Sequence, residues 1–192
     1  MHENERLQVM VEGAIFAGLA MALEYVPHDL GVSSVQFAYG LIPLGIYSLR
    51  RGPIPGMMAG LVWGLLDMWL RGSGSLFNPL QIILDYPLPF ALAGLIGIFH
   101  RQVKTALQAN RWSLALGWIT VGFLIGDLAK YTAHYFSGVF FWGQYAPKGQ
   151  SAWLYSLVIN GGSFIANAVL GVIVFALIVR LLPNLLTRHL SV

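Results

Sequence analysis

The chain has 192 residues, of which 57% are hydrophobic and only 10% are charged, and its formal net charge is +3. A soluble domain carries roughly 25% charged residues, so this composition excludes an ordinary soluble enzyme, a disordered chain and a protein that binds nucleic acid. The absence of cysteine excludes disulfides, thiolate metal sites and a cysteine nucleophile.

Six apolar segments follow one another along the chain. A membrane-spanning helix needs about 20 apolar residues, and in lipid its backbone polar groups must be satisfied internally. We therefore expect an all-α membrane protein in which six transmembrane helices form a single domain over residues 1–192. The second and third segments are short and separated by the sequence RRGP at 50–53, which predicts a tight helical hairpin. The expected helices are 7–26, 35–49, 53–70, 76–99, 113–136 and 152–182.

The basic residues predict the orientation of these helices. If the N-terminus is cytoplasmic, eight Lys and Arg residues fall on the cytoplasmic side, and only Arg71 and Lys148 fall on the outer side. Such a bias is typical of the positive-inside rule. Both termini are then expected in the cytoplasm, which fits an even number of helices. The eight residues are Arg6, Arg50, Arg51, Arg101, Lys104, Arg111, Arg180 and Arg188.

Small residues recur at four-residue spacing in two of the expected helices. Residues four apart share one helix face, and small side chains let another backbone approach closely. Packing within the protein is the simpler interpretation of both stripes. Docking to another membrane protein is the alternative, and the first helix is the better candidate for it. The stripes are Ala14, Gly18 and Ala22 in the first helix, and Gly56, Gly60 and Gly64 in the third.

Charged residues inside membrane spans are costly and are therefore candidate functional groups. Glu12 and Glu24 lie near opposite ends of the first helix, where we expect both to reach the interface and to be structural. Asp67 lies near the outer end of the third helix, where interfacial solvation is the simple interpretation. Asp127 and Lys130 are three residues apart and are expected to form a structural ion pair on one helix face.

Asp85 differs from these acids because two prolines follow it within its span. Pro87 and Pro89 have no amide hydrogen to donate, so they free backbone carbonyls beside the carboxylate and predict a break in the helix. Interrupted helices commonly carry the binding sites of transporters. We therefore interpret Asp85 as a ligand-binding group, rather than as a carboxylate satisfied by a neighbouring hydroxyl.

Aromatic residues gather between the fifth and sixth expected helices. Such residues usually form an anchoring belt at the membrane interface, but His134 and Asn160 are hydrogen-bonding groups that a belt does not need. Together with Asp85, they predict a pocket for a flat heteroaromatic cation, which aromatic faces and a carboxylate would attract. The sequence contains no Walker A, HExxH or GxSxG motif, and therefore no ATP-hydrolysing machinery of its own.

Several of these segments resemble the thiamine-specific S component of energy-coupling factor (ECF) transporters, and the resemblance covers nearly the whole chain. The most specific part is FWGQYAPKG at 141–149. The others are IP at 42–43, SLRRG at 48–52, LDY at 84–86, HYFSG at 134–138, YSL at 155–157 and NG at 160–161.

The resemblance implies a six-helix protein of the prokaryotic plasma membrane that binds thiamine near its outer face as a transported substrate, without a cofactor. It also implies three partner subunits, namely one transmembrane coupling subunit and two ATPases. The docking face of the first helix falls on Ala14 and Gly18, and Ala22 continues this stripe. The family's ligand-binding residues fall on Asp85, Tyr86, His134, Trp142, Tyr155 and Asn160.

The chain departs from some members of this family at two places. Some members have a tryptophan and a glutamate near the first outer loop, where this chain reads SSVQFAY at 33–39. Some have a tyrosine before the fourth helix, where this chain reads GSGS at 72–75. Gln36 or Tyr39 is the candidate for the replacement contacts.

Two other functions are compatible with the sequence. One is a stand-alone secondary transporter of a small cationic heteroaromatic compound, in which Asp127, Lys130 or Asp85 would couple protons. The other is a membrane enzyme that uses His134 and Asp85 as acid and base. The predicted site has only one central carboxylate and one histidine, which argues against the enzyme. The absence of a visible inverted repeat argues less strongly against the carrier.

Overall fold

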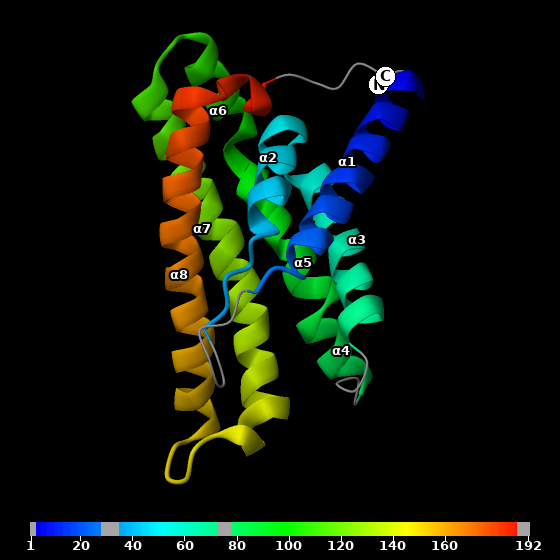
Figure 1. Ribbon diagram of the computed structural model, residues 1–192, viewed down its shortest axis with the longest axis vertical. Coiled ribbons are helices and arrows are strands. Elements are labelled where there is room, and N and C mark those ends of the chain that lie inside the picture. The colour runs from blue at the N-terminus through cyan, green and yellow to red at the C-terminus, as the bar shows by residue number, and fades with distance from the viewer. Residues whose placement is uncertain (1–2, 28–34, 73–77, 188–192) are drawn as a thin grey trace.

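The computed structural model describes residues 3–27, 35–72 and 78–187, and within these ranges it contains helices but no β-strand. This confirms the expected all-α class. The long helices run along the longest axis of the molecule (Figure 1). In chain order, the elements are α1 (Glu3–Leu23), α2 (Leu41–Arg51), α3 (Pro53–Arg71), α4 (Pro79–Asp85), α5 (Pro87–Ala93), η1 (Gly94–Phe99), α6 (His100–Gln108), α7 (Trp112–Ser137), η2 (Gly138–Trp142), η3 (Gly143–Tyr145), α8 (Ala152–Leu181) and η4 (Pro183–Leu186).

Five helical segments in the described part of the chain are long and apolar enough to cross a membrane. They are 4–23, 53–71, 79–108, 112–145 and 152–181. The expected helix at 35–49 is wrong in its bounds, because α2 begins only at Leu41 and has 11 residues. At 1.5 Å per residue it is about 16 Å long, about half the thickness of the bilayer core. Six full-length spans are therefore not observed in these ranges.

The glycine stripe of α3 packs inside the protein. A methyl group built on Gly60 would overlap the carbonyl of Phe90, and one on Gly64 would overlap the carbonyl of Tyr86. One on Gly56 would overlap Ser48. These overlaps mean that α3 lies directly against the backbone of α5, and they confirm internal packing as the role of this stripe.

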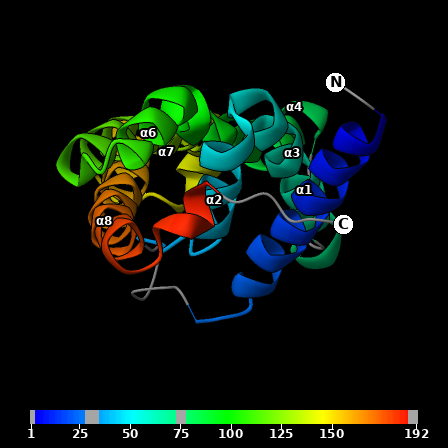
Figure 2. The same cartoon turned by 90° about the horizontal axis from the view of Figure 1, so that it is seen from above.

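The stripe on α1 faces outward instead. Ala14, Gly18 and Ala22 are exposed, and a methyl group built on Gly18 would have no neighbour within 4 Å. The buried side of α1 carries a different set of small residues, among them Gly13 and Ala17. From above, α1 and α8 lie at opposite sides of the bundle with α2 between them (Figure 2). The stripe is therefore available to a partner.

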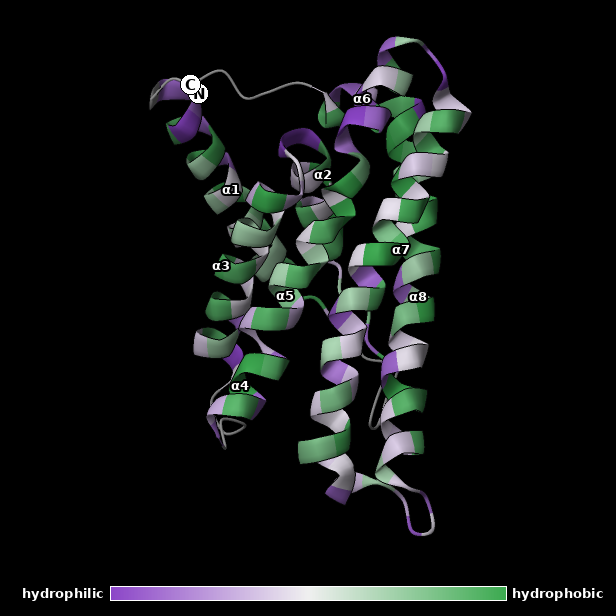
Figure 3. Ribbon diagram, turned by 180° about the vertical axis from the view of Figure 1, so that it is seen from behind, coloured by the Kyte–Doolittle hydropathy of each residue, from purple (hydrophilic) through white to green (hydrophobic). Residues whose placement is uncertain are grey.

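The two ends of the molecule differ in polarity. One end of the molecule holds the beginning of α1, the end of α2, α6 and the end of α8 (Figure 1). Of these, α6 and the beginning of α1 are rich in hydrophilic residues (Figure 3). Seven of the eight basic residues expected in the cytoplasm belong to these elements or to their connections. Arg188 lies outside the described residues. The arrangement agrees with the expected orientation, which stays a prediction.

Glu12 does not reach the interface, contrary to the expectation from its position in α1. Its side chain is 1% exposed and contacts two arginines of α2, with Arg50 Nη2 at 2.6 Å and Arg51 Nε at 2.5 Å. The Tyr47 hydroxyl donates to the carbonyl of Val9 at 2.7 Å. These contacts attach the first half of α1 to α2.

Glu12→Gln is expected to lower the thermal stability of the detergent-solubilised protein. Removing one partner of a buried ion pair costs about 3–5 kcal/mol, because the remaining charge stays buried and uncompensated. Here two guanidinium groups would be left. Lys104→Gln, which removes an exposed charge on α6, is the matched control and should change stability by less than about 0.5 kcal/mol. Equal melting temperatures for the two variants would contradict the structural role of Glu12.

Candidate functional site

The helix break predicted at the two prolines is present. α4 ends at Asp85 and α5 begins at Pro87, and Tyr86 between them has φ −124° and ψ −80°, outside the helical region. The side chain of Asn78 caps the start of α4 by accepting a hydrogen bond from the Gln81 backbone at 2.9 Å. The break therefore leaves Asp85 at the end of a short, capped helix.

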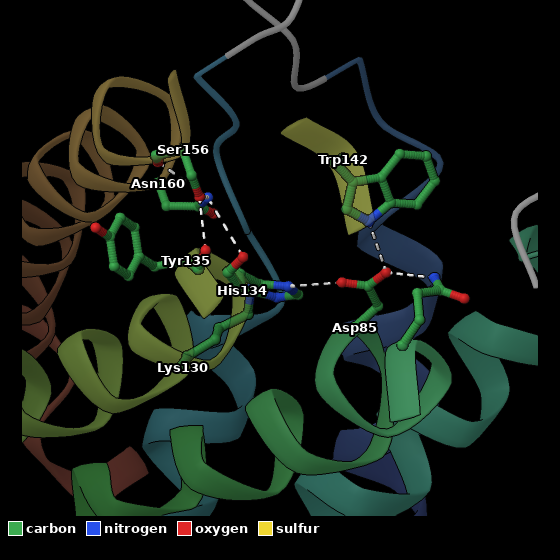
Figure 4. A network of polar contacts seen from close by, with 8 residues as sticks. Asp85, Lys130, His134, Tyr135, Trp142, Ser156 and Asn160 are labelled. Atoms are coloured by element: carbon green, nitrogen blue, oxygen red, sulfur yellow. Dashed lines mark hydrogen bonds and ion pairs between the residues drawn. The ribbon is translucent and has the colours of Figure 1, made fainter. Parts of the chain in front are cut away.

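Two nitrogen donors hold one oxygen of the Asp85 carboxylate. Its Oδ2 accepts hydrogen bonds from Gln81 Nε2 at 2.5 Å and from Trp142 Nε1 at 3.0 Å. Its other oxygen, Oδ1, lies 4.0 Å from His134 Nδ1 (Figure 4). Gln81 is fully buried and was not recognised from the sequence, although its position one turn before Asp85 is the signal that could have identified it.

His134 connects this carboxylate to α7. Its Nε2 lies 3.1 Å from Lys130 Nζ, and an ammonium group can only donate. This contact therefore leaves the imidazole proton on Nδ1, which faces Asp85. Asn160 lies on the other side of the histidine, and its Nδ2 is 3.5 Å from the His134 carbonyl and 3.1 Å from Ser156 Oγ (Figure 4).

These side chains surround one cavity of about 350 Å³. This volume falls within the range of roughly 300–1,000 Å³ that is typical of small-molecule sites. The structure brings together all six residues predicted to bind a ligand, and all six line the cavity: Asp85, Tyr86, His134, Trp142, Tyr155 and Asn160. Whether they contact a ligand stays a prediction.

Three charged residues line the same cavity and were not recognised as part of a site. Arg71 Nη1 lies 2.8 Å from Glu24 Oε2 and 3.0 Å from Asp67 Oδ1. The expectation of solvated interfacial acids is therefore wrong for Glu24 and Asp67, which are buried and paired with the arginine. The spacing of Asp67 and Arg71 predicts their contact, but no sequence signal brings Glu24 to them.

The ion pair expected between Asp127 and Lys130 is wrong. Asp127 is fully buried, and neither carboxylate oxygen has a hydrogen-bond partner among the residues that the structure describes. The Lys130 ammonium points instead toward the cavity. There it contacts His134 and lies over the rings of Tyr131 at 4.4 Å and Phe90 at 5.0 Å. Aromatic faces and an imidazole acceptor stabilise the ammonium in this position.

The aromatic cluster divides into two groups. Trp142 and Tyr145 line the cavity with their ring centroids 5.9 Å apart. Phe140 and Trp153 are mostly exposed, as an anchoring belt requires. The cluster is therefore both pocket wall and interface belt.

Of the two candidates for replacement contacts in the first outer loop, Gln36 lines the cavity and Tyr39 lines a separate apolar groove beside α1. Ser33, Ser34 and residues 73–75 lie outside the described residues.

The cavity is lined by both acidic and basic side chains. The acids are Glu24, Asp67 and Asp85, and the cations are Arg71 and Lys130. With its aromatic rings, this set can hold a small cationic aromatic molecule. No group of three side chains suited to a metal ion occurs in the described ranges.

Comparisons with known proteins find strong similarity over nearly the whole chain. A family described as "Thiamine transporter protein" matches residues 10–187. The thiamine transporter ThiT of Lacticaseibacillus paracasei is 45% identical over 187 residues, which cover 96% of this chain and 93% of the relative. The thiamine transporter ThiT of Bacillus subtilis is 33% identical over 97% of both chains. The solved structure of ThiT from Listeria monocytogenes superposes with a TM-score of 0.90 and 37% identity, covering 96% of this chain and all of that one.

Arg71→Gln is expected to destabilise the protein, because Glu24 and Asp67 would lose their shared cation. Removing one partner of a buried pair costs about 3–5 kcal/mol, but the Arg71 side chain is 32% exposed. We therefore expect a loss of about 1–3 kcal/mol after allowance for solvent screening. The free energy of unfolding in detergent measures it. Adding Asp67→Asn should recover part of the loss, and strictly additive losses would contradict the coupling.

Proposed function

Because the chain belongs to the thiamine transporter protein family, we propose that it captures thiamine from outside the cell as the substrate-specificity subunit of an ECF transporter. It is a multi-pass protein of the cell membrane, and its relatives are transporters rather than enzymes. The observation that carries the proposal is the cavity, in which an acid, an imidazole, an amide and aromatic rings converge near the end of the molecule opposite the basic residues.

We assign the recognition of thiamine to the six cavity residues named above. Thiamine carries an aminopyrimidine ring and a positively charged thiazolium ring. Trp142 and the tyrosines provide ring faces, which attract a cation. Asp85 Oδ1 is the carboxylate oxygen not held by Gln81 and Trp142, so it is the natural acceptor for an amino group. Asn160 and His134 bind the remaining polar edge.

We assign energy coupling to other subunits. The chain has no ATP-binding motif, so two ATPase subunits and a transmembrane coupling subunit would drive transport. The exposed stripe of Ala14, Gly18 and Ala22 on α1 is the proposed docking face, because small residues permit close packing between membrane helices. In this arrangement both termini are cytoplasmic, and the cavity opens toward the outer side of the membrane.

Asp85→Ala and Trp142→Ala are each expected to weaken thiamine binding at least about tenfold, which corresponds to 1.4 kcal/mol. Thiamine is titrated into the purified protein, and the heat of binding is measured by calorimetry. This signal, unlike tryptophan fluorescence, does not depend on the presence of Trp142. Trp153→Ala is the matched control, because this tryptophan is exposed and lies outside the cavity lining. Wild-type affinity in both cavity variants would refute the site assignment.

Gly18→Leu is expected to abolish thiamine uptake while leaving thiamine binding unchanged. A Cβ atom at position 18 has no neighbouring atom of the protein within 4 Å. The leucine side chain would, however, fill the space that a docked helix needs. Uptake into vesicles that contain the coupling and ATPase subunits measures the effect, and Leu19→Ala, at an exposed position next to the stripe, is the control. Uptake by the protein alone, driven by a pH gradient, would instead favour a stand-alone secondary transporter.

A further inference from the structure

A short extended segment forms one wall of the cavity. We call residues 35–38 the wall segment; Gln36 and Ala38 within it line the cavity. The segment is extended rather than helical, with a single β-bridge at Gln36, so most of its backbone groups need partners outside helices and sheets. Buried backbone groups without a partner are rare, because each costs about as much as a lost hydrogen bond.

Asn167 of α8 supplies two of these partners. Its Oδ1 accepts a hydrogen bond from the Ala38 backbone at 2.8 Å, and its Nδ2 donates to the Gln36 carbonyl at 2.8 Å. The amide thus pairs with the wall segment much as a neighbouring strand would. One turn earlier on α8, Ser163 Oγ accepts from the Gln36 backbone at 3.0 Å. These contacts join positions 127–131 residues apart.

The same amide also contacts a residue of α7 that lines the cavity. Asn167 Nδ2 lies 3.0 Å from the hydroxyl of Tyr131, which lines the cavity from α7. Asn167 is only 1% exposed and is not part of the cavity lining. Its amide therefore acts through the wall segment and through Tyr131, and not by contact with a ligand.

We propose that Asn167 is a positioning residue, which holds the wall segment against α8 and thereby sets how long thiamine stays in the cavity. This inference rests on the proposed function. Without the Asn167 amide, the Gln36 carbonyl and the buried Ala38 amide each lose a hydrogen bond. The Ala38 amide regains a partner only if the segment moves away from α8 and meets water. Such a displacement removes one wall from the cavity and opens a route of escape for the ligand.

Asn167→Leu tests the proposal, because leucine has a similar size and cannot form these hydrogen bonds. In the full-length protein we expect thiamine to dissociate at least about tenfold faster, while the association rate changes by less than about threefold, since most mutational effects on affinity act through dissociation. Stopped-flow tryptophan fluorescence measures both rates. Ser163→Ala, which removes one of the three bonds to the wall segment, should produce a smaller increase.

Ser48→Ala is the matched control for a general loss of stability. Ser48 is also buried and hydrogen-bonded, but its hydroxyl donates to Leu44 within α2, away from the wall segment. Thiamine should dissociate from the Ser48→Ala protein at the same rate as from the wild type. An unchanged dissociation rate in Asn167→Leu would overturn the inference. If the wild-type protein itself fails to bind thiamine, the proposed function fails instead.

A covalent substitute for the lost hydrogen bonds provides a second, independent readout. A Cβ built on Gly162 of α8 lies 3.9 Å from Val35 Cβ, within the 3.5–4.5 Å that a disulfide requires. The chain has no other cysteine to interfere. Val35→Cys and Gly162→Cys are therefore introduced into the Asn167→Leu protein, which is loaded with thiamine and then oxidised.

We expect the oxidised protein to release thiamine as slowly as the wild type, and a reductant to restore fast release. Only a role in holding the wall segment predicts this reversible rescue, because the substitution at Asn167 is present in both states. Fast release from protein that is fully cross-linked, as shown by the loss of free thiols, would overturn the inference.

Discussion

The break at Tyr86 is the constraint on which the rest of the site depends. A helix cannot hold Pro87 and Pro89 in its interior without losing backbone hydrogen bonds, so the segment divides and Asp85 becomes the last residue of α4. There its carboxylate meets an amide from the preceding turn and an indole from beyond α7. The glycines of α3 allow that helix to lie against the backbone at the break, which fixes the geometry of α4 and α5.

Buried charge also decides which face of α1 is exposed. Glu12 turns toward the arginines of α2 near the middle of α1, and Glu24 turns toward Arg71 just beyond the end of the helix. An acid in a membrane must be paired or neutral, so both glutamates face the protein. The small-residue stripe then points outward. The ion pairs of Glu12 and Glu24 thus keep α1 attached to the bundle and leave its face of small residues exposed.

The cavity itself is assembled by close approach of α7 and α8. A methyl group on Gly138 would overlap Ser156 Oγ, so the glycine allows the end of α7 to lie directly on the first turns of α8. Ser156 can then donate to the Tyr135 carbonyl at 2.7 Å. The helical turns after Gly138 direct Trp142 back toward α4, where it meets Asp85 (Figure 4). The recognition groups are consequently positioned by backbone packing and not by loops.

The sequence by itself determined the apolar helices, the break beside Asp85 and the residue types of the cavity, because hydropathy, proline chemistry and local motifs are properties of neighbouring residues. Only the tertiary structure decided the partners of the charges. Glu24 joins the arginine that Asp67 already contacts one turn away, and Lys130 contacts a histidine and two aromatic rings instead of Asp127. It also decided that α2 begins at Leu41, because Asn167 and Ser163 hold the preceding backbone in an extended form. Contacts across more than a hundred residues depend on how helices pack, and no local pattern records them.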